Sequence, residues 1–89
     1  MKAFITVIGK DKIGIIHGVT AVLKNYQVNV LDITQTLLQE YFTMIMLVDL
    51  AAMTIDFKEL KETLEAAGQD LDMSIRIQHE DIFHSMHTI

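Results

Sequence analysis

The apolar residues of this chain follow two different spacings, and the order in which the spacings alternate constrains its fold most strongly. Alternation at every second residue, or a short β-branched run, predicts a strand, whereas spacing at every third or fourth residue predicts a helix. The sequence therefore predicts the element order β-α-β-β-α-β. The strand-like stretches are residues 3–9, 28–39, 41–50 and 72–78, and the helix-like stretches are residues 15–26 and 56–68.

This order indicates a ferredoxin-like α+β sandwich, in which a four-stranded antiparallel sheet carries two helices on one face. The two middle strands meet at Gln39–Glu40, which predicts a hairpin. Asp56 is the expected N-cap of the second helix, with a glutamate three residues later, and Gly68 is its expected stop. A short C-terminal helix is also expected, so that the chain divides into a domain of residues 1–79 and a helical extension of residues 80–89.

Composition excludes several classes of function. Because the 89 residues include no cysteine, disulfides, zinc–thiolate sites and thiol catalysis are excluded, and a cytoplasmic location is expected. The net charge of −5, without a cluster of Lys or Arg, argues against nucleic acid as a partner. No stretch approaches the roughly 18 apolar residues of a membrane helix. The expected partner is therefore a small molecule or a protein.

The strand at residues 41–50 is apolar on both faces, although one face of an antiparallel sheet normally meets water. Ile45 and Leu47 contribute to one face, and five other apolar residues form the other. This pattern predicts a central strand whose second face is covered, or whose sheet is extended, by self-association. A homodimer or a higher homo-oligomer is therefore expected. The five residues are Phe42, Met44, Met46, Val48 and Leu50.

Two glycines stand at the start of the first helix, where a helical glycine costs roughly 0.5–1 kcal/mol relative to alanine. The first N–H groups of a helix lack partners within it and favour a carboxylate or phosphate. Gly14 would leave these groups uncovered, whereas Asp11 could cap some of them itself. Gly18 belongs to a row of small residues along one edge of the helix. Such a row leaves room either for a ligand or for tight packing of the helix on its own sheet.

The segments "DKIGIIHGVTAVL" and "VNVLDITQ" resemble the ACT domain family, and the resemblance spans about residues 3–78 in element order. Within the family, the chain most resembles the small stand-alone ACT proteins and the N-terminal ACT segment of formyltetrahydrofolate deformylases. It is also similar to the glycine-cleavage regulators of bacteria. Many members place a proline before the glycine of the first turn, where this chain has Ile13. The family pattern, Asp-x-x-Gly-Ile followed by Asn-(Ile/Val), is matched here by Asp11, Gly14, Ile15, Asn29 and Val30.

The resemblance implies a regulatory module, not an enzyme, that binds an amino acid without a cofactor at a homodimer interface. A partner enzyme is a further implied partner. The ligand would lie between the first turn and helix of one copy and the second strand of the other. There Asn29 offers a donor and an acceptor, and Asp32 could pair with an ammonium group. The implied site residues are Asp11, Lys12, Ile13, Gly14, Ile15, Gly18, Asn29 and Asp32.

Two rival functions follow from the same fold. An acylphosphatase-like hydrolase would need an arginine in the loop before the first helix, but Arg76, in the last strand, is the only arginine. Catalysis is therefore not expected. A protein-interaction module that dimerises, or docks on an enzyme, without binding a metabolite remains the alternative to the amino-acid sensor.

A metal site is a third reading, because Glu80, His84 and His87 would share one face of a C-terminal helix, with His79 nearby. Imidazole and carboxylate at this spacing can hold zinc or nickel. The same segment also carries an apolar stripe, which favours a helix that docks by the stripe while its histidines face water. We therefore assign no metal ligands. The stripe consists of Ile82, Phe83, Met86 and Ile89.

Overall fold

The six elements occur in the predicted order in a computed structural model, which describes residues 1–10 and 14–80. The ferredoxin-like βαββαβ arrangement is therefore confirmed. Their boundaries lie within three residues of the predicted ones. The elements are β1 (Lys2–Lys10), α1 (Ile15–Asn25), β2 (Asn29–Leu38), β3 (Tyr41–Asp49), α2 (Phe57–Leu71) and β4 (Met73–His79).

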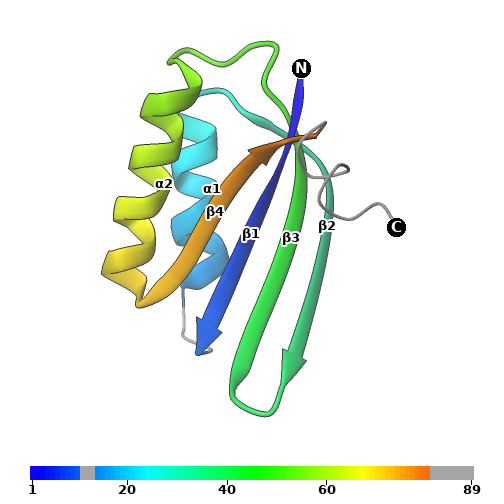
Figure 1. Cartoon of the computed structure of the whole chain (residues 1–89), viewed down its shortest axis with the longest axis vertical. Helices are drawn as coiled ribbons and strands as arrows, with labels where there is room; N and C mark the ends of the chain where they lie inside the picture. Colours follow the sequence, from blue (N-terminus) through cyan, green and yellow to red (C-terminus); the bar gives the residue numbers. More distant parts are fainter. Residues whose placement is uncertain (11–13, 81–89) are drawn as a thin grey trace.

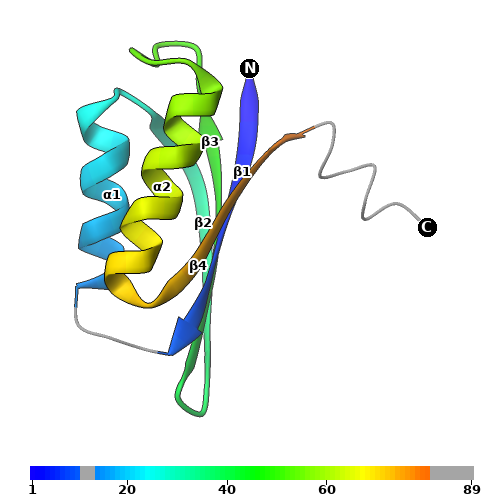
Figure 2. The same ribbon diagram turned by 60° about the vertical axis from the view of Figure 1, so that its left-hand side comes forward.

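The four strands form one antiparallel sheet in the order β2-β3-β1-β4. β1 and β3 pair along their whole length, from Lys2 opposite Asp49 to Lys10 opposite Tyr41. Both helices cover the same face of the sheet, as Figures 1 and 2 show. The prediction that strand 41–50 is central is therefore confirmed, and β2 and β4 are left as the two edge strands.

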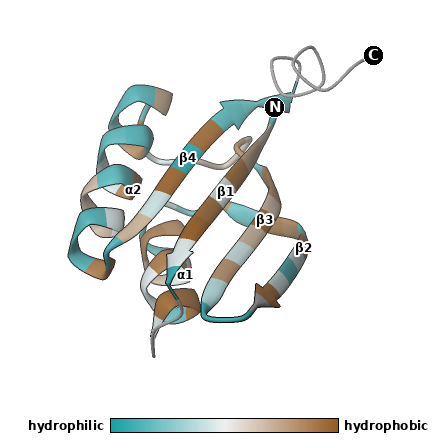
Figure 3. Cartoon of the chain, turned by 60° about the horizontal axis from the view of Figure 1, so that its bottom comes forward, coloured by the Kyte–Doolittle hydropathy of each residue, from teal (hydrophilic) through white to brown (hydrophobic). Residues whose placement is uncertain are grey.

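The core lies between the sheet and the helices, and it is built from alternate residues of the central strands. Figure 3 shows that β1 is hydrophobic along most of its length, whereas hydrophobic and hydrophilic residues alternate in β4. The β4 alternation is the predicted one, with Met73, Ile75 and Ile77 buried and Ser74 and Arg76 exposed. The largest fully buried side chains are Ile5, Val7, Val19, Leu23, Met44, Met46, Val48, Leu60 and Leu64.

The second helix begins as predicted but ends later. Oδ1 of Asp56 accepts a hydrogen bond of 2.8 Å from the backbone N–H of Glu59, which confirms Asp56 as the N-cap. The prediction that Gly68 stops this helix is wrong, because the helix continues to Leu71 and Asp72 supplies the left-handed C-cap residue at φ 55°. Gly68 is instead a buried residue within the helix.

Close contact with β4 explains the glycine at position 68. An ideal Cβ built on Gly68 would lie 2.7 Å from the carbonyl oxygen of Met73 and 3.1 Å from Cγ1 of Ile75. Only a residue without a side chain lets the helix approach the strand backbone this closely. Gly68 is therefore a packing residue rather than a helix stop.

The β2–β3 connection is the predicted two-residue joint at Gln39–Glu40, where Gln39 adopts a left-handed φ of 57°. The expected C-terminal helix falls almost entirely on residues 81–89, which lie outside the described part of the chain. Among the helices that the structure describes, none has the length and apolar character needed to cross a membrane.

Candidate functional site

The first helix starts at Gly14, which is exposed and has φ 90° and ψ 4°. Glycine adopts this left-handed conformation readily, whereas other residues pay about 1–2 kcal/mol. A Cβ built here would find open space, with no described atom within 4 Å. Backbone conformation is thus sufficient to explain Gly14. The neighbouring candidates Asp11, Lys12 and Ile13 lie outside the described residues.

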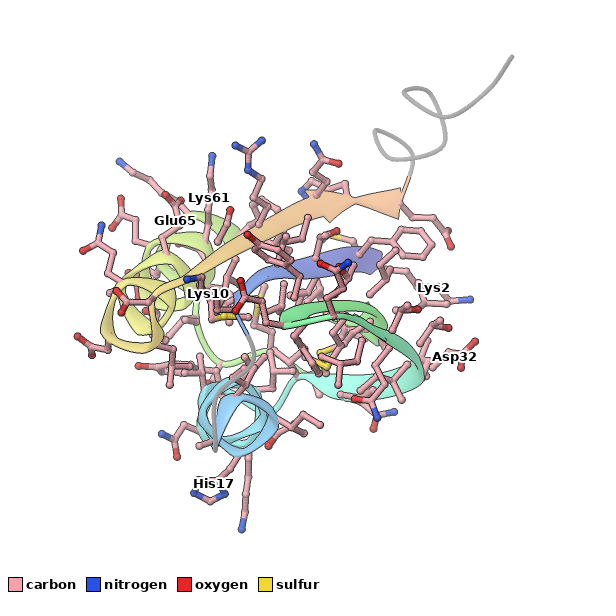
Figure 4. All side chains as sticks on the ribbon, turned by 90° about the horizontal axis from the view of Figure 1, so that it is seen from below. Lys2, Lys10, His17, Asp32, Lys61 and Glu65 are labelled. Carbon is pink, nitrogen blue, oxygen red and sulfur yellow. The ribbon has the colours of Figure 1, made fainter. Side chains whose placement is uncertain are left out.

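The beginning of α1 presents backbone N–H groups without a capping side chain from residues 1–10 or 14–80. The N-cap glycine makes no side-chain hydrogen bond, and the first turn contains no acidic residue. Ile15 is buried in the core, whereas His17 is exposed and points away from the body of the molecule in Figure 4. Among the described residues, no side chain therefore competes with an anion for the positive end of the helix dipole.

Gly18 faces the other helix, α2. A Cβ at Gly18 would lie 3.0 Å from Cδ1 of Leu71, a residue in the last turn of α2. The space beside Gly18 is thus filled by a side chain of the same chain. Packing between α1 and α2 accounts for this glycine.

Asn29 and Asp32 lie on the first part of β2, and both are exposed. Their register opposite Asp49 and Leu47 directs both side chains to the sheet face away from the helices. A bulge between Val30 and Asp32 interrupts the pairing at this point. Oδ1 of Asp32 also accepts a hydrogen bond of 2.9 Å from the N–H of Ile33, so it has a local structural role.

One chain does not bring the predicted site residues together. In Figure 1 α1 starts at the end of the molecule where β2 finishes, whereas β2 starts at the opposite end. Figure 4 likewise shows Asp32 at the β2 side of the molecule and His17 on α1 pointing elsewhere. A site that combines Gly14 with Asn29 would therefore need the second residue from another copy.

Exposed apolar side chains occur along β2 on the face that also carries the helices. Register places Val30 and Ile33 beside the buried residues Val48 and Met46, yet they are 36% and 43% exposed, because neither helix extends over this edge strand. Ile16 is 41% exposed and lies about 200° around α1 from Gly18, so it faces away from α2. We call this set the β2–α1 surface: Ile16, Val30, Ile33 and Leu37.

A hollow of about 490 Å³ lies at the opposite edge of the sheet, between α2 and β4. Lys61 and Glu65 of α2 and Arg76 of β4 give it charges of both signs, and the two α2 side chains point outward in Figure 4. None of the residues predicted from the sequence lines this hollow. No sequence motif marks this hollow, since its lining is an ordinary polar helix face and the edge of an alternating strand.

The metal reading involved His84 and His87, which lie outside the described residues. His79 is described, and its ring stacks on Phe57 with 4.0 Å between ring centroids. Across residues 1–10 and 14–80, no three histidine or carboxylate side chains gather as a metal site would require.

Comparison with known proteins shows which family and which solved structures this chain is similar to. A family model described as the ACT domain matches residues 2–78. A UPF0237 protein from Clostridium acetobutylicum is 54% identical over 89 residues, which covers the whole of both chains. The structure of an ACT domain protein from Streptococcus pneumoniae is 47% identical, covers 93% of each chain and superposes with a TM-score of 0.81.

Two further solved structures share the fold at lower identity. A protein described as a glycine cleavage system transcriptional repressor is 23% identical, with a TM-score of 0.74 over 86% of this chain and 44% of its own. A formyltetrahydrofolate deformylase from Pseudomonas syringae is 20% identical, with a TM-score of 0.76 over 88% of this chain and 27% of its own. The expected likeness to both groups is confirmed at the level of fold.

Fold and sequence together define a small regulatory module of ferredoxin-like architecture. More particularly, the chain belongs to the ACT domain family.

Proposed function

We infer that this ACT domain senses an amino acid at the interface of a homodimer and regulates an enzyme through that binding. The observation that carries this inference is the β2 edge with its β2–α1 surface. Natural edge strands are usually protected by lysine, proline or a covering element. β2 contains neither lysine nor proline, and it exposes Val30, Ile33 and Leu37 beside its free edge.

Antiparallel pairing of β2 with β2 of a second copy would continue the sheet and cover the β2–α1 surfaces of both copies. Such pairing reverses the direction of the partner strand. The start of the partner's strand would then lie beside the finish of β2 in the first copy, which is also the end where α1 begins. Asn29 from one copy and the α1 start at Gly14 from the other would thereby approach each other.

The chemistry of this arrangement suits an amino acid. The uncapped N–H groups at the start of α1 would receive the carboxylate. Asn29 is the first residue of β2, so its amide oxygen would reach around the end of the strand to accept from the ammonium group. Asp32 lies further along β2 than Asn29, and its Oδ1 already accepts a hydrogen bond from the N–H of Ile33, so we give it no direct ligand contact. Asp11, Lys12 and Ile13 remain proposed parts of the turn that closes the site.

The dimer is tested by light scattering on the full chain and on Ile33→Lys, which puts a charge on the β2–α1 surface. We expect a dimer mass for the parent chain at tens of micromolar and a monomer mass for the variant. Glu65→Lys, at an exposed position of α2, is the matched control and should stay dimeric. A monomeric parent chain would refute the interface.

Ligand binding is tested by calorimetry against a panel of amino acids, with Gly14→Asn as the informative variant. Asparagine tolerates a positive φ better than other side chains, so it adds bulk at the helix start with little backbone strain. We expect this variant to fold and dimerise but to lose binding, while Ala66→Asn on the exposed face of α2 retains it. If no amino acid binds the parent dimer, the interaction-module alternative replaces the sensor.

A further inference from the structure

The outer edge of β4 offers backbone hydrogen-bonding groups to a further strand. In the part of the chain that the structure describes, β4 pairs with β1 and with no other strand (Figure 1). The direction of its backbone groups follows from the β1–β3 ladder, where Lys2 lies opposite Asp49 and the next residues outward are Met1 and Leu50. The N–H of Leu50 donates a hydrogen bond of 2.8 Å to the carbonyl oxygen of Met1, so these two residues form a hydrogen-bonded pair.

Hydrogen-bonded pairs alternate with non-bonded pairs along an antiparallel ladder. Every second residue of β1 after Met1 therefore bonds to β3, and the residues between them bond to β4. Thr6 is one of the residues that bond to β4, and it lies opposite Arg76. The N–H and carbonyl groups of Arg76 thus point toward β1, whereas those of Ile75 and Ile77, on either side of it, point toward the open edge.

The contacts of α2 agree with this direction and limit the open part of the edge. Met73 has the same backbone orientation as the outward-facing residues, and its carbonyl oxygen meets α2 at Gly68, 2.7 Å from a built Cβ. At the other end of β4, the ring of His79 stacks on Phe57 of α2. The hollow of about 490 Å³ lies between these two contacts, so it is a groove along the open part of the edge.

Charged side chains stand in both walls of this groove. On the α2 side, three lining residues recur at every fourth position and so form one row along the helix. On the other side, the residues of β4 that face away from the helices form a row in which Arg76 is the only charged residue. The rows are Lys61, Glu65 and Gln69 from α2 and Ser74, Arg76 and Gln78 from β4.

The positions of the two α2 charges along the groove follow from the contact at its end. α2 begins beside the end of β4, because Phe57 stacks on the last residue of that strand. Four helix residues rise about 6 Å, and two strand residues rise about 6.6 Å. Lys61, four residues after Phe57, therefore lies beside Ile77. Glu65, four residues further, lies beside Ile75.

An extended protein segment fits the length and the walls of this groove. From Met73 to His79 the strand advances about 20 Å at 3.3 Å per residue, so a segment of about five residues fits between the end contacts. Ile75 and Ile77 each present one backbone donor and one acceptor to such a segment. In strand addition these groups supply affinity, while alternate side chains of the added segment meet the two walls.

A second copy of the chain fits the groove less well. Symmetric antiparallel pairing that uses Ile75 and Ile77 of both copies would place the two Arg76 side chains directly opposite each other, and like charges in that position destabilise a sheet. Moreover, β2 is the edge proposed for the dimer. Pairing at both edges would extend the sheet from copy to copy without closing.

We propose that the β4 edge binds an extended segment of a partner protein by strand addition, with an acidic side chain of the segment beside Arg76. The neighbouring residue toward Ile77 is acidic and faces Lys61, and the neighbouring residue toward Ile75 is basic and faces Glu65. An antiparallel segment therefore has the order acidic, acidic, basic. This surface lies at the opposite edge of the sheet from β2 and is independent of the proposed amino-acid binding.

Nuclear magnetic resonance titration of the full chain with a synthetic peptide tests the strand addition. The probe is acetyl-Thr-Glu-Glu-Lys-Thr-amide, whose central glutamate would lie beside Arg76. We expect the amide signals of Ile75 and Ile77 to shift most at millimolar peptide, because their N–H groups gain partners, whereas the N–H of Arg76 is already bonded to β1. A probe that is N-methylated at the first glutamate and at the lysine lacks both donors to the edge and should bind several-fold more weakly.

An exchange of charges tests the recognition by Arg76. Arg76→Glu should weaken binding of the probe several-fold, and replacement of the central glutamate of the probe by lysine should restore it. Lys58→Glu makes a similar change of charge at an exposed position of α2 outside the groove, so it is the matched control and should leave binding unchanged. Circular dichroism checks that each variant is folded.

Each of the other outcomes would overturn the proposal. Largest shifts along β2 would place the peptide at the wrong edge, and equal binding of the N-methylated probe would exclude backbone pairing. An equal effect of Lys58→Glu and Arg76→Glu would reduce the recognition to net charge. No shift at several millimolar peptide would show that the edge does not accept a strand. Shifts of Ile75 and Ile77 on raising the protein concentration alone would assign the edge to a second copy.

Discussion

Substitution of Gly68 by alanine separates helix propensity from packing, because the two effects have opposite signs. In an exposed helix interior, the exchange of glycine for alanine stabilises by about 1 kcal/mol. At Gly68 the new Cβ would lie 2.7 Å from the carbonyl oxygen of Met73, whereas close C···O contacts in proteins are about 3.3–3.6 Å. α2 and β4 must therefore separate by at least roughly 0.6 Å, or the β4 backbone must distort.

The close contact at Gly68 sets the expected change in the free energy of unfolding. Overpacking of a tight core costs about 1–3 kcal/mol, and a backbone oxygen, unlike the end of a side chain, cannot rotate away, so the upper half of this range applies. After subtraction of the propensity gain, Gly68→Ala should lower the free energy of unfolding by about 1–2 kcal/mol. For a domain of this size, each kcal/mol corresponds to about 4–8 °C in Tm.

Urea denaturation at one fixed protein concentration measures this change, since dimerisation would make the stability concentration-dependent. Gly18→Ala is the matched comparison, because its Cβ meets the flexible end of Leu71 at 3.0 Å instead of a backbone atom. It should stay within about 1 kcal/mol of the parent chain. Ala66→Gly, at an exposed position of α2, calibrates the propensity term at about 1 kcal/mol of destabilisation. A Gly68→Ala protein as stable as its parent would refute the reasoning.

Three other predictions follow from local structure. Asp56→Ala removes the N-cap hydrogen bond of α2 and should cost about 1 kcal/mol in urea denaturation, while Asp56→Ser should retain most of the stability. Gly14→Ala forces alanine to φ 90° and should cost about 1–2 kcal/mol, with Gly14→Asn costing less, and equal costs in thermal melts would contradict the strain argument. His84→Gln combined with His87→Gln should leave the Tm unchanged with and without added zinc, and zinc-dependent stabilisation of the parent chain alone would reinstate the metal reading.

The order of the elements could be predicted from the sequence because each element has its own periodicity. The alternation in β4 and the N-cap at Asp56 depend on neighbours along the chain, so the sequence reports them directly. The central position of β3 was also predictable, because so apolar a strand favours a place between two others. That place buries its edges but not its second apolar face. The sequence was sufficient to predict a structural feature wherever residues close together along the chain determine that feature.

The glycines show where local pattern is insufficient. Gly68 has the sequence context of a helix stop, but its role depends on the distance between α2 and the carbonyl of Met73. Gly18 likewise depends on Leu71, more than fifty residues away. The face on which Asp32 lies could not be predicted either, because the bulge after Val30 changes the register by one residue. In each of these three examples, the role or orientation of the residue depends on how it packs or pairs with another segment, which the local sequence pattern does not report.

The exposure of β2 has a consequence for the way the domain opens and closes. Val30, Leu31, Ile33 and Leu37 are all exposed, so this strand is joined to the body of the domain mainly by its backbone pairing with β3. Local opening free energies are lowest where few apolar contacts must break. The amides of β2 should therefore exchange with deuterium sooner than those of β1 and β3 in an isolated copy. If β2 pairs in the proposed dimer, protection of these amides should rise with protein concentration, so that their exchange rate reports whether a second copy is bound.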